Sequence, residues 1–242
     1  MKKISLGLSA FALSASLFAS PALAASSTSF KDVPSPYRTT IQGLVDKGII
    51  TGANEGIFSP NLLVTRAEFV STLVRALELN DTGEHVSFLD VSPDSWSYEP
   101  FKRAYQHGLL KGVSTKDENI IANPNGKMTR LEMIVMITRT EENSSSFIKL
   151  NRKDATALLT SYSDAFQVPS WAKQTLANAI HNGITSGTSS TTLGVSEYGT
   201  RLQSALFADR AKNQTTKHET KTVTLSNGYS YTGEVNEKNE PN

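Results

Sequence analysis

The chain repeats itself, and the repeat limits its fold more than any other feature of the sequence. A Thr-Arg pair, one further residue and then Glu or Gln occurs three times, as TRAE at 65–68, TRLE at 129–132 and TRLQ at 200–203. An aromatic residue, a spacer, an Asp and a small apolar residue precede each of them, as FKDV at 30–33, FLDV at 88–91 and YSDA at 162–165. The sequence therefore predicts three units, at residues 28–80, 86–140 and 154–211.

Each unit has the pattern of a helix, a loop and a second helix. The first helix carries apolar residues three and four positions apart, which form one face. It ends at a glycine that can take the left-handed conformation, and these glycines are Gly48, Gly108 and Gly183. One helix pair cannot bury its own apolar stripe, so the units must pack on one another. We expect an all-α fold, a pseudo-threefold assembly of three helix-loop-helix repeats, with a further short helix at 154–160.

The Thr and the Glu or Gln of the repeated motif form a capping box at the start of the second helix. The Thr hydroxyl accepts a hydrogen bond from the third helical N–H, and the Glu or Gln side chain accepts one from the N–H of the Thr. Gln203 fits as well as Glu68 or Glu132, because the box needs an acceptor and not a charge. Each cap stabilises its helix by about 1 kcal/mol.

Capping does not explain the arginine of the motif, because a cation in the first helical turn opposes the helix dipole. One interpretation is an anion site, in which free N–H groups at the helix start and a planar guanidinium bind a carboxylate or phosphate. The other is a structural ion pair with the Asp of the upstream motif. The residues alone leave both interpretations open for Arg66, Arg130 and Arg201 with Asp32, Asp90 and Asp164.

Both tryptophans of the chain occupy the same repeat position. Trp96 and Trp171 precede the helix-ending glycine by the same spacing, and Tyr37 lies close to that position in the first unit. Saccharide sites commonly combine an aromatic face with polar and charged groups. Tryptophan also serves as a core or interface anchor, and the spacing does not decide between the two roles.

The N-terminus has the pattern of a secretory signal peptide at residues 1–24. Lys2 and Lys3 precede an apolar stretch, and small residues at Ala22–Ala24 provide a cleavage site. The alternative, an uncleaved membrane anchor, is disfavoured because the apolar run is short and rich in serine. We therefore expect a secreted protein with no membrane contact after cleavage. Cysteine is absent, so a hydrophobic core and not disulfide bonds must hold the fold.

Composition and motifs argue against catalysis and against a nucleic-acid partner. The formal net charge is +1, which gives no global field to attract nucleic acid. The four histidines form no paired metal-ligand motif, and no thiol nucleophile, nucleophile elbow or phosphate-binding loop occurs. We expect no enzyme activity, no metal and no cofactor.

Taken in order, these motifs resemble the S-layer homology domain family over residues 30–210. The first two units match well, and the third matches in its first helix and diverges afterwards. The resemblance implies noncovalent anchoring to the bacterial cell wall. It implies as partner a secondary cell-wall polymer, linked to peptidoglycan, whose terminal sugar carries a pyruvate ketal and hence a carboxylate.

The resemblance also implies binding residues, in grooves between neighbouring units. In the family, the arginine of the motif contacts the ketal. The grooves are lined by the Asp and Trp near the first helix and by backbone near the glycines at the end of that helix. Carried over, the candidates are Arg66, Arg130, Arg201, Asp32, Asp90, Asp164, Trp96, Trp171, Gly48, Gly108 and Gly183. The chain departs from the pattern at Tyr37 in the first unit and Gln203 in the third.

Residues 212–242 have the composition of a polar linker and tail. Alternating residues around an Asn-Gly pair predict a short β-hairpin there, and YSYTGEV resembles the start of a MORN repeat. Two alternatives to a self-contained anchor follow. The chain could be a structural S-layer subunit, which normally needs a larger assembly domain. It could also be the anchor of a truncated or accessory surface protein whose cargo domain, an enzyme or an assembly domain, is missing.

Overall fold

The computed structural model confirms the all-α fold. It describes residues 30–110, 115–116, 119–142, 144, 146–216, 220–224 and 230–234. The predicted signal peptide and the Asn-Gly pair of the tail lie outside the described residues. Among the described residues, no helix is long and apolar enough to cross a bilayer.

The described helices are distributed over three parts of the chain. The first unit contains a 3-10 turn and two helices, η1 (Ser35–Tyr37), α1 (Arg38–Asp46) and α2 (Arg66–Ala76). The second contains α3 (Tyr98–Gln106) and α4 (Arg130–Glu141). The third contains η2 (Ala165–Gln167), α6 (Ser170–His181) and α7 (Arg201–Thr216). The extra short helix is α5 (Arg152–Leu159), close to its predicted bounds.

Four short strands form two antiparallel pairs in the part of the chain that the structure describes. In the second unit β1 (Thr115–Lys116) pairs with β2 (Asn119–Ile120). In the tail β3 (Thr220–Thr224) pairs with β4 (Ser230–Glu234).

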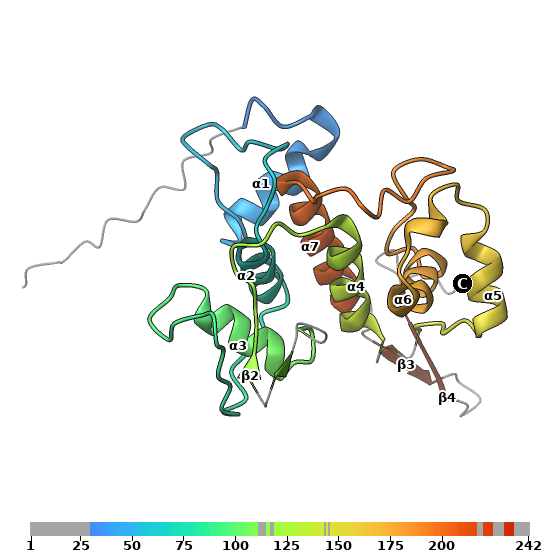
Figure 1. Ribbon diagram of the computed structural model, residues 1–242. Helices are drawn as coiled ribbons and strands as arrows, with labels where there is room; N and C mark the ends of the chain where they lie inside the picture. The colour runs from blue at the N-terminus through green and yellow to red at the C-terminus, as the bar shows by residue number, and fades with distance from the viewer. Residues whose placement is uncertain are drawn as a thin grey trace, which may run out of the picture.

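The second helices of the three units, α2, α4 and α7, lie together at the centre of the molecule (Figure 1). The segments that precede them are joined cyclically by three isolated bridges, Leu63 with Thr200, Thr65 with Lys127 and Thr129 with Tyr198. The first N–H of each helix donates, at 2.8 Å, to a carbonyl in the loop of the next unit, from Arg66 to Gly126, Arg130 to Glu197 and Arg201 to Leu62. The cycle closes on itself, as a pseudo-threefold assembly requires.

Local signals place the helix ends where the sequence predicts them. The capping boxes of α2 and α4 are complete. In the third unit the Thr200 N–H donates to the Gln203 side chain at 3.1 Å, and the Gln203 N–H donates to the Thr200 hydroxyl at 3.2 Å. Gly48, Gly108 and Gly183 follow the first helices with φ of 68°, 73° and 71°, in the left-handed region. Glycine takes this region without the steric cost that a side chain adds.

Side chains from all three units fill the core. Phe69 and Leu73 of α2, Met133 and Ile137 of α4 and Phe101 of α3 are fully buried. Burial of each such side chain contributes about 1.5–3 kcal/mol. Because most residues of α2 and α4 are buried, these two helices form the centre of the core.

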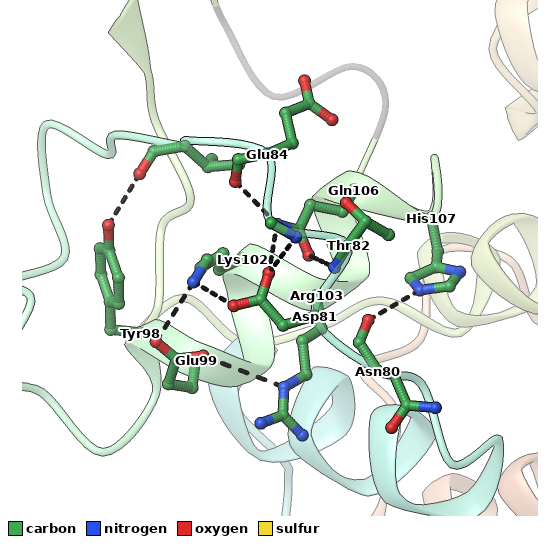
Figure 2. A network of polar contacts seen from close by, with 12 residues as sticks. Asn80, Asp81, Thr82, Glu84, Tyr98, Glu99, Lys102, Arg103, Gln106 and His107 are labelled. Carbon is green, nitrogen blue, oxygen red and sulfur yellow. Dashed lines mark hydrogen bonds and ion pairs between the residues drawn. The ribbon is translucent and has the colours of Figure 1, made fainter.

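A polar network attaches the segment that links the first two units to helix α3 (Figure 2). Lys102 donates from Nζ to Asp81 Oδ2 at 2.5 Å, and Gln106 donates to the other carboxylate oxygen at 2.8 Å. These hydrogen bonds, with one from the Gly83 N–H, hold the pKa of Asp81 far below its ordinary value. The Tyr98 hydroxyl donates to the Val86 carbonyl at 2.7 Å. The network thereby holds the start of α3, next to Trp96, in place.

Candidate functional site

The three aspartates of the upstream motif organise the turn that leads to the second helix. Each carboxylate accepts from two consecutive backbone N–H groups of its own unit. The donors are Phe58 and Ser59 for Asp32, Ala122 and Asn123 for Asp90, and Leu193 and Gly194 for Asp164, at 2.7–2.9 Å for the closest contacts. The second donor always has a positive φ, 57° at Ser59, 51° at Asn123 and 66° at Gly194. The third unit thus has the same turn, although it lacks the Pro-Asn pair that the first two units carry at 60–61 and 124–125.

The role of the Asp32 carboxylate can be tested through the pH dependence of protein stability. Burial of the carboxylate raises its pKa. The hydrogen bonds from the N–H groups of Phe58 and Ser59 and the charge of Arg201 lower the pKa, and together they outweigh burial, so the pKa lies below its ordinary value. A lowered folded-state pKa contributes stability above the unfolded pKa, and this contribution is lost as the pH falls through the folded value. We expect Asp32→Asn to lower the free energy of unfolding at pH 7 by about 1 kcal/mol.

The same substitution should cost less at about pH 3, because that pH lies below the ordinary aspartate pKa of 3.8, where the stability contributed by a lowered pKa is being lost. Urea unfolding of both proteins at the two pH values measures this difference. An equal loss at both pH values would contradict a role for the ionised carboxylate.

The arginines of the motif hold neighbouring units together. Arg201, in the third unit, donates to first-unit carbonyls, from Nε to Phe58 at 2.9 Å and from Nη2 to Thr51 at 2.8 Å. Its guanidinium lies over the Phe58 ring, 4.9 Å from the centroid. Arg130, in the second unit, reaches into the third in the same way. The equivalent contacts therefore follow the cycle of the repeats.

Arg130 is the most fully satisfied of these arginines. It is 7% exposed and packs over the Phe207 ring. Its Nε donates to the Leu193 carbonyl at 3.3 Å, and its Nη2 donates to the Thr185 hydroxyl and the Gly187 carbonyl, both at 3.1 Å.

Arg66 differs from the other two. It is 9% exposed, its Nη1 lies 3.6 Å from Glu132 Oε1, and the same nitrogen contacts the Met128 sulfur at 3.5 Å. Within the described part of the chain, its Nε has no hydrogen-bond partner. Burial lowers the pKa of Arg66, and the carboxylate of Glu132 opposes this change. The guanidinium remains charged, since an arginine is not deprotonated in a protein.

Two parts of the sequence interpretation need correction. Among the described residues, none of these arginines forms an ion pair with Asp32, Asp90 or Asp164, because those carboxylates accept backbone N–H groups instead. The helix-start N–H groups that an anion site would use are also occupied, by carbonyls of the next unit. What a ligand can reach is therefore side chains at the boundary between units.

The tryptophans are at the surface. Trp96 is 66% exposed and Trp171 is 62% exposed, while Tyr37 is 38% exposed. This exposure excludes the core-anchor interpretation for both tryptophans. A large exposed aromatic face is available for contact with a ligand or a partner.

Trp96 forms one wall of a hollow between the first and second units, of about 180 Å³, called here the first groove. Side chains of all three units line it, because Arg201 enters from α7. The lining residues are Ile50, Thr51, Phe58, Val64, Glu68, Ser71, Thr72, Arg75, Trp96, Arg201 and Ser204. The structure thus brings together the predicted Trp96 and Arg201, with the capping Glu68 beside them.

Trp171 lines the corresponding hollow between the second and third units, called here the second groove. Its other lining residues are Thr129, Leu131, Glu132, Gln167, Pro169, Val195 and Ser196. Thr129 and Glu132 repeat the place of Thr65 and Glu68 in the motif. The aspartates Asp32, Asp90 and Asp164 and the glycines Gly48, Gly108 and Gly183 line neither groove, and they act through the backbone that they shape.

Sequence reasoning missed a second set of arginines, Arg75, Arg139 and Arg210, one on each second helix. Each donates to the carbonyl of the residue after the helix-ending glycine of its own unit, namely Ile49, Leu109 and Ile184. Their constant spacing after the arginine of the motif was the signal that could have found them. Within the described residues, no group of three acidic or histidine side chains could hold a metal ion.

The helix-loop-helix units and their cyclic contacts agree with the protein family that comparison with known sequences finds. The family model of the S-layer homology domain matches residues 29–70 and 161–203, in the first and third units.

Curated relatives agree with that class. The chain is 29% identical to a surface-layer 125 kDa protein of Lysinibacillus sphaericus over 96% of this chain and 20% of the relative. It is 30% identical to an S-layer protein of Bacillus thuringiensis subsp. finitimus over 79% of this chain and 22% of the relative. An amylopullulanase of Thermoanaerobacterium thermosulfurigenes is 28% identical over 73% of this chain and 9% of the relative. The chain thus spans about a fifth or less of these relatives.

Proposed function

We propose that this protein anchors noncovalently to the bacterial cell wall by binding an acidic secondary cell-wall polysaccharide, through grooves between its repeats. The observation that carries the proposal is the exposed Trp96 beside the Arg201 guanidinium in the first groove. The match to the S-layer homology domain and the S-layer proteins among the relatives support a cell-surface location.

The groove offers what an acidic sugar needs. The indole of Trp96 can stack on the apolar face of a sugar ring, and Arg201 can donate to a carboxylate such as that of a pyruvate ketal. Thr51, Ser71 and Thr72 supply hydroxyl or backbone groups for the sugar's own hydroxyls. One charge-assisted hydrogen bond contributes about 1.5–3 kcal/mol at best, so tight attachment depends on several contacts together.

The relatives bear on what the anchor carries. Some are S-layer proteins and others are named as enzymes, such as the amylopullulanase and an exoglucanase of Acetivibrio thermocellus. The part matched by this chain is what these proteins share, so we assign to it the anchoring and not a catalytic reaction. A cargo domain elsewhere in the same protein is compatible with this assignment, as is an accessory role without one.

Co-sedimentation with purified cell-wall sacculi tests the proposal. We expect the wild-type protein to sediment with sacculi that keep their secondary polymer, and to stay in solution after mild acid has removed the ketals. Arg66 and Arg130, the other two arginines of the motif proposed for binding, are buried between units, so their removal affects folding first. If sedimentation is absent, or is unchanged after ketal removal, the proposal is wrong.

A further inference from the structure

The three boundaries between units differ in charge and in polarity, although the repeat makes them equivalent by sequence. Resting on the function proposed above, we infer that the first groove alone forms the site for a carboxylate-bearing sugar. We also infer that Arg75 and Ser71 are specificity-determining residues of that site.

The first groove is the cationic one. Arg75 and Arg201 both line it, against one carboxylate, that of Glu68. Arg75 is exposed and, within the described part of the chain, makes a single hydrogen bond, from Nε to the Ile49 carbonyl at 2.8 Å. Its two terminal nitrogens therefore remain available to a ligand. Two guanidinium groups in one small hollow can share a carboxylate and an adjacent sugar oxygen.

The second groove has the opposite charge. Glu132 is the charged residue among those that line it, and no lysine or arginine belongs to that lining. The arginine from the neighbouring unit, Arg66, is buried and pairs with Glu132. A ligand carboxylate would meet Glu132 before any free cation, so this groove disfavours an anion although Trp171 is as exposed as Trp96.

The remaining arginine of the motif is Arg130, at the boundary between the second and third units. It is 7% exposed, makes three hydrogen bonds to the third unit, and packs over Phe207. Its guanidinium is therefore committed to holding the protein together. The first unit carries Tyr37 in place of the tryptophan, and the third unit carries Gln203 in place of the glutamate.

The helix positions that form the floor of the first groove are polar in the first unit and apolar in the second. Two consecutive positions of the second helix are Ser71 and Thr72 in the first unit, and the same positions carry Val135 and Met136 in the second unit. Ser71 is 2% exposed and lines the first groove, and among the described residues its hydroxyl has no hydrogen-bond partner. A buried hydroxyl without a partner is costly. A sugar hydroxyl or carboxylate reaching the floor would satisfy it, whereas Val135 and Met136 carry no polar group and do not line the second groove.

The test compares matched variants in co-sedimentation with sacculi that keep their ketals. Trp96→Ala and Trp171→Ala remove equally exposed side chains, so both should fold. We expect Trp96→Ala to weaken binding about tenfold or more, and Trp171→Ala to bind as the wild type does. Arg75→Gln should weaken binding similarly. Its control, Arg139→Gln, removes the equivalent hydrogen bond, to the Leu109 carbonyl, outside the first groove.

Ser71→Ala separates binding from folding. Because no hydrogen bond is lost in the free protein, we expect its melting temperature to be maintained or raised while wall binding weakens. The inference is overturned if wild-type protein sediments but Trp171→Ala loses as much binding as Trp96→Ala, or if Arg75→Gln and Ser71→Ala bind normally. Absence of wild-type sedimentation instead refutes the proposed function, and the inference with it.

Discussion

Arg130→Ala should lower the free energy of unfolding by roughly 3 kcal/mol. The substitution removes a buried guanidinium that donates to the Leu193 and Gly187 carbonyls and to the Thr185 hydroxyl. It leaves those acceptors without their donor and opens a space over the Phe207 ring. Both effects fall on the boundary between the second and third units, so the third unit should unfold more readily.

Urea unfolding followed by circular dichroism measures this loss. Arg152→Ala is the control, because Arg152 is an exposed arginine at the start of α5, and its removal should change the unfolding free energy by less than about 0.5 kcal/mol. A protein with Arg130→Ala that is as stable as wild type would show that the arginine of the motif is not a structural link between units.

Gly187→Ala should destabilise the same boundary by about 3 kcal/mol. Gly187 has a φ of 87°, and an added Cβ would lie 2.3 Å from the Thr192 carbonyl oxygen. That oxygen belongs to the backbone, so it cannot move aside as a flexible side chain would. The Gly187 carbonyl also accepts from Arg130, so the two substitutions disturb one contact.

Gly43→Ala provides the matched control, with the opposite sign. Gly43 lies inside α1, and an added Cβ would meet no atom within 4 Å. Alanine there should stabilise the protein by about 0.5–1 kcal/mol. In a double-mutant cycle, Arg130→Ala with Gly187→Ala should cost less than the two single losses together. Full additivity would contradict the contact.

The sequence was sufficient for the helical fold and for the caps of its helices, because these depend on residues a few positions apart. The spacing of Thr65 and Glu68 defines a capping box in any context, and Gly48 ends a helix for a local steric reason. The positions of the helices followed from the same periodicity. The third unit's departures in its loop did not change its turn, since Gly194 takes the left-handed position that Ser59 and Asn123 take elsewhere.

The roles of the charged residues could not be predicted in the same way, because their partners come from distant segments. Arg201 donates to the carbonyls of Thr51 and Phe58, which belong to the first unit and are far from Arg201 in the sequence. Asp32 reaches across its own loop, to Phe58 and Ser59. The exposure of Trp96 likewise depends on how whole units pack. The first groove is therefore a product of assembly, and Arg75, which lines it, has no local signal beyond its recurrence.

The most direct test of wall anchoring is a calorimetric titration of the wild-type protein with a defined ligand. The ligand is a methyl glycoside that carries a pyruvate ketal, and the comparison is the same glycoside without the ketal. We predict saturable binding of the ketal form, at one molecule per chain, and no detectable binding of the other. Equal binding of the two glycosides, or no binding of either, would contradict recognition of an acidic wall sugar.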